Sequence, residues 1–180
     1  MKIRILILFF FTTLIVFAQA PNSEEKIKEL KVKVSQTIAG EKLTWMDSLS
    51  KVIVTETNYI NDSIVRETVT YAMELDSIRV ATWHIANLIY FQNNRAGDPK
   101  NGNDIFIDFL DNATQTNSNH ALAKYYIEGA DSYYFIEYFD ESIRYFNIAE
   151  EYARKAKNSR LEGLAIRYKG GTLSFQGAFA

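Results

Sequence analysis

The sequence contains no cysteine, only two prolines and only eight glycines among its 180 residues. The absence of cysteine excludes disulfide bonds, thiolate metal sites and a cysteine nucleophile. The scarcity of glycine argues against an all-β protein, which needs many tight turns. With 47% hydrophobic and 23% charged residues, the chain is too apolar to be disordered and too poor in proline and glycine to be of low complexity. These figures predict an ordinary folded protein.

The N-terminus has the three parts of a secretory signal peptide. Two basic residues precede an apolar run from Ile5 to Phe17, and small residues follow the run. The run is shorter than the roughly 20 residues that a membrane-spanning helix needs. We therefore interpret residues 1–18 as a signal peptide, with cleavage after Ala20 as the alternative and an uncleaved signal anchor as the other interpretation. A signal peptide predicts that the protein is exported to the periplasm or another extracytoplasmic place.

The charge of the mature chain argues against two classes of partner. Removal of Lys2 and Arg4 from the 20 basic residues leaves 18 against 22 acidic ones, a net charge of −4. A mildly acidic chain has no counterion-release drive toward nucleic acid. The lack of a basic cluster also argues against an anionic membrane surface. Contact with a membrane is expected only through a transmembrane helix that would lie beyond residue 180.

Almost all of the sequence after Asn22 has the apolar spacing of amphipathic helices. The first of these segments could also form an edge strand, because lysine and valine alternate within it. The segment RAGDPKNGN, residues 95–103, is the one clear loop that the pattern predicts. The sequence therefore predicts an all-α fold of about eight helices. Their ranges are 24–38, 41–57, 63–75, 76–94, 104–113, 120–136, 139–156 and 159–175.

The second half of the chain repeats with a period of 40 residues. A small residue in the middle of a helix allows a partner helix to approach closely, and an aromatic residue fills the hairpin turn that follows. A helical hairpin cannot bury its apolar face alone, so such units are expected to stack. The equivalent pairs are Ala130 and Gly170, Phe135 and Phe175, and Phe139 and Phe179.

On these residues the segment 121–180 resembles the tetratricopeptide repeat family, in a variant longer than the usual period of roughly 34 residues. Ser142 stands where the family commonly has alanine. The resemblance implies a solenoid of helical hairpins, with degenerate repeats over 23–120 and a truncated last repeat before Ala180. The residues that it assigns to packing within the repeats are Tyr126, Ala130, Tyr133, Phe139, Ser142, Phe146, Ala149, Gly170 and Phe179.

The family resemblance also implies a function. Tetratricopeptide arrays bind a protein or peptide in a groove, without catalysis, and the candidate groove contacts here are Tyr134, Glu137 and Arg167. The alternative is the extracytoplasmic sensory part of a signal-transduction protein. Exported arrays of this kind resemble those of Bacteroidetes-type bacteria, where they often precede a histidine kinase or a helix-turn-helix regulator. In that case the output domain would follow residue 180.

The sequence offers little support for catalysis or metal binding. His84 and His120 are the only histidines, and neither has an acidic residue at the spacing of metal ligands. We interpret both as structural or surface residues. Carboxylate pairs such as Asp140 and Glu141 are sequence neighbours, which point to different sides of a helix. The sequence therefore predicts no catalytic, cofactor or metal site and no enzyme activity.

Overall fold

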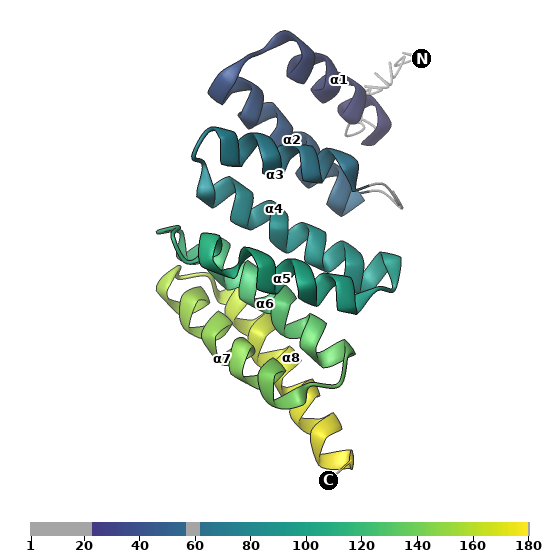
Figure 1. Cartoon of the computed structure of the whole chain (residues 1–180), viewed down its shortest axis with the longest axis vertical. Helices are drawn as coiled ribbons and strands as arrows, with labels where there is room; N and C mark the ends of the chain where they lie inside the picture. Colours follow the sequence, from purple (N-terminus) through teal and green to yellow (C-terminus); the bar gives the residue numbers. More distant parts are fainter. Residues whose placement is uncertain (1–22, 57–61, 180) are drawn as a thin grey trace, which may run out of the picture.

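The computed structural model describes residues 23–56 and 62–179, and these ranges form an all-α fold, as predicted. Eight α-helices and one π-helical segment succeed one another along an elongated molecule (Figure 1). The predicted signal peptide, residues 1–18, lies outside the described residues. None of the described helices combines the length and the apolar character required to cross a membrane. The elements are α1 (Ser23–Gln36), α2 (Ala39–Glu56), α3 (Ser63–Glu74), α4 (Ile78–Phe91), η1 (Gln92–Ala96), α5 (Pro99–Ala113), α6 (Asn119–Phe135), α7 (Phe139–Lys155) and α8 (Ser159–Phe179).

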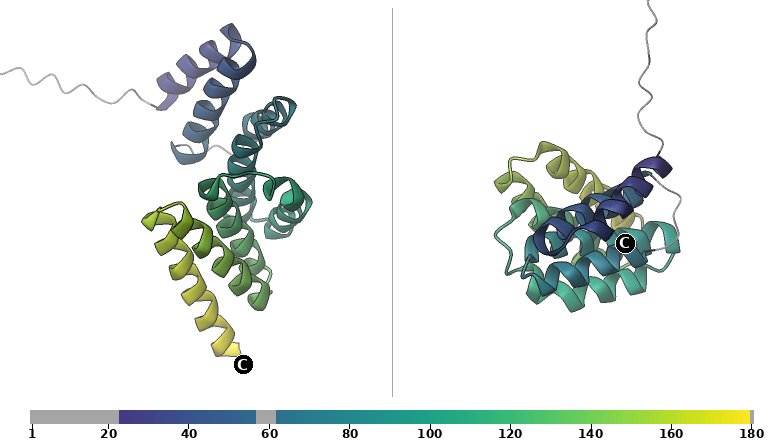
Figure 2. Two further views of the ribbon diagram at one scale, coloured as in Figure 1. Left: turned by 90° about the vertical axis from the view of Figure 1, so that its left-hand side faces the viewer. Right: turned by 90° about the horizontal axis from the view of Figure 1, so that it is seen from above.

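Every helix packs against the next helix along the chain, so neighbours in sequence are neighbours in space (Figure 2). A second set of contacts joins alternate helices, because α2 contacts α4, α4 contacts α6 and α6 contacts α8. Among the described residues, the backbones of the odd-numbered α-helices do not approach one another in this way, although side chains of α5 and α7 meet at Phe106 and Tyr145. The even-numbered helices therefore form a continuous row, and the odd-numbered helices lie beside it.

The helices of this row start at nearly constant intervals. They begin at Ala39, Ile78, Asn119 and Ser159, so successive starts lie 39, 41 and 40 residues apart. The 40-residue period that the sequence shows in its second half thus continues through the described chain as a spacing of helices. Side chains in the N-terminal half do not display this period, which there is visible in the starts of the helices.

Three interhelix turns share one backbone geometry. The first residue after the C-cap has a positive φ at Asp76, Glu137 and Lys157. At the third turn, Lys157 N–H donates to the carbonyl of Arg154 and the next N–H donates to the carbonyl of Ala153, both at 3.0 Å. The other two turns contain the same pair of bonds. This is the Schellman motif, which satisfies the last carbonyls of a helix and usually has glycine at the left-handed position.

Replacing Lys157 by glycine is expected to raise the free energy of unfolding by about 0.5–1 kcal/mol. Lys157 has a φ of 52°, a left-handed conformation that strains any residue with a Cβ. Relief of that strain outweighs the additional entropy that glycine gives the unfolded chain. Urea denaturation measures the change, and Lys157→Ala is the matched control. An equal gain in both variants would contradict a backbone origin.

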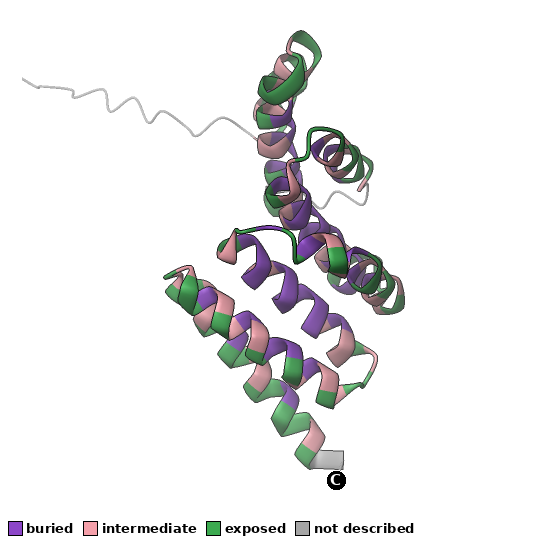
Figure 3. Cartoon of the chain, turned by 60° about the vertical axis from the view of Figure 1, so that its left-hand side comes forward, coloured by how far each residue is buried: buried purple, intermediate pink, exposed green. Residues whose placement is uncertain are grey.

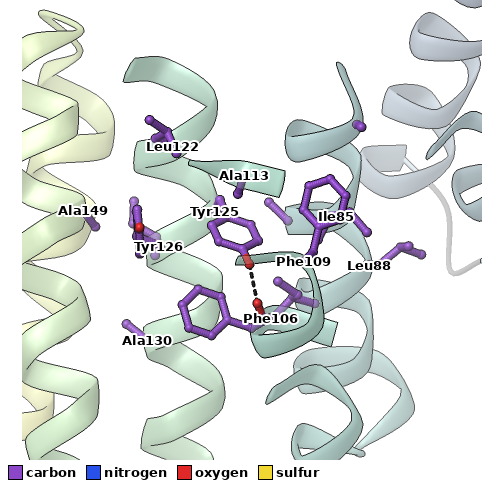
Figure 4. Packing of buried hydrophobic residues seen from close by; sticks show 14 of the residues in the cluster. Ile85, Leu88, Phe106, Phe109, Ala113, Leu122, Tyr125, Tyr126, Ala130 and Ala149 are labelled. Atoms are coloured by element: carbon purple, nitrogen blue, oxygen red, sulfur yellow. Dashed lines mark hydrogen bonds between the residues drawn. The ribbon is translucent and has the colours of Figure 1, made fainter. Parts of the chain in front are cut away.

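Most of the buried side chains belong to one core that runs from α2 to α8 (Figure 3). Its centre is aromatic, with Phe106 of α5 fully buried between Tyr125 and Tyr145, whose ring centroids both lie 4.9 Å away. The Tyr125 hydroxyl donates a hydrogen bond to the Phe106 carbonyl (Figure 4). A smaller cluster joins α1 to the C-terminal half of α2. Its buried members are Ile27, Leu30, Leu49, Val52 and Ile53.

The segment 95–103 is not the loop that the sequence predicted. Helix η1 extends to Ala96 and α5 begins at Pro99, so that only Gly97 and Asp98 lie outside helices. Gly97 ends η1 with a φ of 68°, and the Asp98 side chain caps α5 by accepting a hydrogen bond from the backbone N–H of Asn101 at 3.2 Å. Turn-favouring residues act here as helix caps.

The residues that the sequence assigned to repeat packing have different environments. Gly170 requires a correction, because it is exposed and a Cβ added there would meet no atom within 4 Å. It therefore makes no close interhelix contact within the described residues. Phe179 is the last residue of α8, and its side chain lies outside the described part. Tyr126, Ala130, Ser142, Phe146 and Ala149 are buried, and Tyr133 and Phe139 are half-buried.

Candidate functional site

A pocket of about 290 Å³ lies between α6, α8 and η1. We call it the α6/α8 pocket. Two of the three predicted groove residues, Tyr134 and Arg167, line it. The third, Glu137, does not line it, because this residue forms the left-handed turn after α6 and is exposed. The lining residues used below are Asn94 of η1, Asp131, Tyr134 and Phe135 of α6, and Arg167 and Tyr168 of α8.

Helix η1 is fixed to α6 by the side chain of Asn93, which is buried. Its amide donates to the Glu128 carbonyl at 3.1 Å and accepts from the Ser132 hydroxyl at 2.9 Å. These two bonds hold the next residue, Asn94, beside Asp131, to which the Asn94 side chain hydrogen-bonds. A π-helical segment at the end of α4 thus supplies one wall of the pocket, as such segments often do at functional sites.

Asp131 is the acidic residue of the pocket lining. Burial of its carboxyl, together with the nearby charge of Glu128, raises its pKa to about 7, although the hydrogen bond from Asn94 acts in the opposite direction. The carboxyl is therefore only partly ionised at neutral pH. Among the described residues, no lysine, arginine or histidine forms an ion pair with it.

Aromatic rings gather at the mouth of the pocket around Tyr134. The centroid of the Tyr134 ring lies 5.4 Å from that of Phe135, 5.6 Å from that of Phe175 and 6.2 Å from that of Phe139. Phe135 is 43% exposed and Phe175 is 49% exposed. Large apolar side chains that remain this exposed side by side are typical of interaction sites. Phe135 and Phe175 are one of the equivalent pairs of the 40-residue repeat, but the sequence did not indicate that both rings contact Tyr134.

Arg167 is the cation of the pocket lining. Its guanidinium lies 5.0 Å from the centroid of the neighbouring Tyr168 ring, in cation–π contact. The residue is exposed and forms no ion pair with the described residues. The pocket therefore offers a desolvated carboxyl, aromatic walls and one arginine at the surface. It contains no nucleophile paired with a base.

A second polar cluster lies in the interior between α2 and α4. His84 is fully buried, its Nε2 lies 2.8 Å from Oδ1 of Asp47, and the Asn87 amide lies 3.2 Å from its Nδ1. The Asn87 amide can only donate to Nδ1 through its NH₂ group, which places the imidazole proton on Nε2, directed at Asp47. The acidic partner that the sequence did not reveal is thus 37 residues away.

Burial lowers the pKa of His84, although the hydrogen bond and charge of Asp47 act in the opposite direction. Burial also acts to raise the pKa of Asp47, but hydrogen bonds from His84 and Lys51 outweigh it and lower that pKa. The pair is therefore a neutral imidazole donating to an ionised carboxylate. This arrangement agrees with the structural role that the sequence predicted for His84.

His120, the second histidine, lies close to this cluster although it belongs to α6. It is exposed, and its ring centroid is 4.9 Å from that of Trp83. Both line a small pocket of about 80 Å³ that also includes Asp47 and Lys51. Within residues 23–56 and 62–179, no group of three histidine or acidic side chains could hold a metal ion.

The sequence did not identify Asp131 or Asn94 as site residues. Asp131 lies one turn before Tyr134 on α6 and shares its face of the helix, which is the signal that could have found it. No comparable signal exists for Asn94, because it is the last residue of the predicted helix 76–94 and nothing local shows what it contacts. Comparison of the chain with protein-family models, with curated proteins and with solved structures found no match.

Proposed function

We propose that this protein is a non-catalytic interaction module that binds a peptide segment of a partner protein in the groove between α6 and α8. The observation that carries the proposal is the α6/α8 pocket with its exposed aromatic mouth. A hollow of 290 Å³ beside two phenylalanines that are 43% and 49% exposed is suited to receiving side chains of another chain. Aromatic residues in such positions supply most of the binding energy of interfaces.

The proposal includes a tetratricopeptide-like repeat architecture and export from the cytoplasm. The regular starts of α2, α4, α6 and α8 support stacked hairpins of about 40 residues, with the groove formed by the first helix of each hairpin. Tyr134 and Arg167 both belong to such first helices. Export is supported by the basic and apolar N-terminal sequence.

Replacing Tyr134 by serine is expected to weaken peptide binding at least tenfold, because it removes the ring around which the aromatic mouth is built. The measurement is selection from a phage-displayed library of random nine-residue peptides. Affinities of the selected peptides are then determined by fluorescence anisotropy for the wild-type protein and the variant.

Tyr138→Ser is the matched control. Tyr138 is 58% exposed, follows closely after Tyr134 in the sequence and does not line the pocket. We expect this variant to bind the selected peptides with wild-type affinity. Failure to select any peptide, or equal losses in both variants, would overturn the proposed groove.

A further inference from the structure

The α6/α8 pocket contains a carboxylate that lacks a cation. Asp131 is half-buried against η1, and its side chain is hydrogen-bonded by the neutral amide of Asn94. A carboxylate that is withdrawn from water is normally paired with a positive charge or with several donors. Within the described chain, Asp131 has neither. The missing partner is one that a bound ligand can supply.

The charges around Asp131 do not provide this partner. On α6, Glu128 lies one turn away and is itself buried, and its carboxylate is bound by Lys124 Nζ at 3.0 Å. From α8, Arg167 lies over the ring of Tyr168 and forms no ion pair with Asp131. The lining residue from α7, Phe146, is apolar. Asp131 is therefore left without a cationic partner among these groups.

The walls of the pocket fit the rest of a basic side chain. The rings of Tyr134, Phe135 and Tyr168 line the space beside Asp131. Aromatic faces attract cations, and the aliphatic stems of lysine and arginine pack on apolar surfaces while the charged end reaches a polar partner. An acidic side chain would be repelled by ionised Asp131, and an apolar one would leave this carboxylate withdrawn from water without a partner.

We propose that the α6/α8 pocket accepts a basic side chain, lysine or arginine, of the bound peptide, and that Asp131 is its counter-ion. This inference rests on the proposed peptide-binding function and specifies the chemistry of the partner. The pocket volume of about 290 Å³ accommodates one large side chain, so we expect the pocket to bind a single basic residue of the peptide.

The test compares the peptides selected by the wild-type protein with those selected by Asp131→Asn from the same random library. We expect lysine or arginine at one position of the wild-type peptides, and loss of this preference in the variant. A selected peptide is then synthesised with arginine, lysine or glutamine at that position. Wild type is expected to bind the glutamine peptide at least tenfold more weakly than the better basic one, whereas Asp131→Asn binds all three alike.

Dependence on pH provides a second measurement on the same peptides. Because a cation binds only the ionised carboxylate, wild-type affinity for the basic peptide should rise by up to tenfold per pH unit as the pH increases toward 7. It should level off above that value, where Asp131 is ionised before binding. The affinity of Asp131→Asn should not follow this curve. Asparagine keeps the size of the side chain, and thermal unfolding checks that the variant is folded.

The outcomes separate this inference from the function on which it rests. If the selected peptides require Tyr134 but show no preference for a basic residue, the assignment of Asp131 is overturned and the groove stands. The same holds if the basic preference persists in Asp131→Asn. Absence of any peptide that depends on Tyr134 overturns both. A basic preference that disappears with Asp131→Asn supports both.

Discussion

Replacing Gly129 by alanine is expected to lower the free energy of unfolding by about 3 kcal/mol, as overpacking of a rigid core does. A Cβ at this position would lie 2.6 Å from Cγ of Phe106 and still closer to two other carbons of that ring. The ring cannot move aside, because it is fully buried and packed against Tyr125 and Tyr145. The gain of about 1 kcal/mol in helix propensity from glycine to alanine is therefore outweighed. Chemical denaturation measures the net change.

Gly170→Ala is the matched control in the equivalent helix of the next hairpin. Gly170 lies inside α8 and no atom lies within 4 Å of the position of its Cβ. Only the gain in helix propensity from glycine to alanine remains, so this substitution should stabilise the protein by up to about 1 kcal/mol. Opposite signs for the two substitutions are the expected result. Stabilisation in both would show that α5 can move away from α6 at little cost.

The two glycines also show what the repeat pattern could and could not predict. Ala130 and Gly170 are equivalent by sequence, and the pattern correctly indicates helices at both places. Close packing, however, depends on what lies opposite. Helix α6 is contacted by α4, α5, α7 and α8, whereas α8 is contacted only by α6 and α7 within the described chain. A close approach of α5 to α6 falls at Gly129, where the large ring of Phe106 lies opposite the missing side chain.

The helices themselves could be predicted because their signals are local. Apolar periodicity and caps are carried by residues within one or two turns, and the eight predicted segments each contain a helix. The loop predicted over 95–103 was wrong because the signal for helix in this segment is not local. Its glycine, proline and aspartate favour turns as well as helix ends, and only the burial of Asn93 against α6 shows that η1 continues the helix.

The polar groups of the site depend on contacts between distant residues, which the sequence does not display. Asn94 meets Asp131 across 37 residues, and Asp47 meets His84 across the same separation. That Tyr134 and Arg167 line the same pocket agrees with their places on two recognisable helices, whereas their role as groove contacts remains a prediction. The position of a buried carboxyl relative to a neighbouring element has no such periodic signal.

Protonation of His84 is expected to cost the protein stability as the pH falls below about 6.5, whereas Asp131, with its pKa raised to about 7, acts in the opposite direction in the same range because the folded chain binds its proton first. The folded protein keeps the His84 imidazole neutral, since burial lowers its pKa below the ordinary value of 6.5. Below pH 6.5 the unfolded chain therefore binds a proton that the folded chain does not. The contribution of His84 to the free energy of unfolding then declines by up to about 1.4 kcal/mol per pH unit until its folded pKa is reached.

The local geometry opposes protonation of His84 as well. Its Nδ1 accepts a hydrogen bond from the Asn87 amide at 3.2 Å, and a proton on Nδ1 would direct one donor at another. Asp47 does not contribute in this range. Its pKa is lowered from 3.8, so the stability that it provides is present above that pH and is lost only when the pH falls further.

Denaturation curves recorded between pH 5 and pH 8 for the wild type and His84→Gln test this expectation. Glutamine retains a donor that can reach Asp47 but does not titrate, so the variant should be less stable near pH 8 and should lose less stability on acidification. His120→Gln is the matched control. Its pKa is also lowered, by partial burial and by Lys51 and Lys124, but its ring is exposed whereas that of His84 is fully buried, so we expect it to contribute less. The His120→Gln curve should therefore stay closer to the wild-type curve than the His84→Gln curve does. If His84→Gln ran parallel instead, the acid sensitivity would originate outside the Asp47–His84–Asn87 cluster.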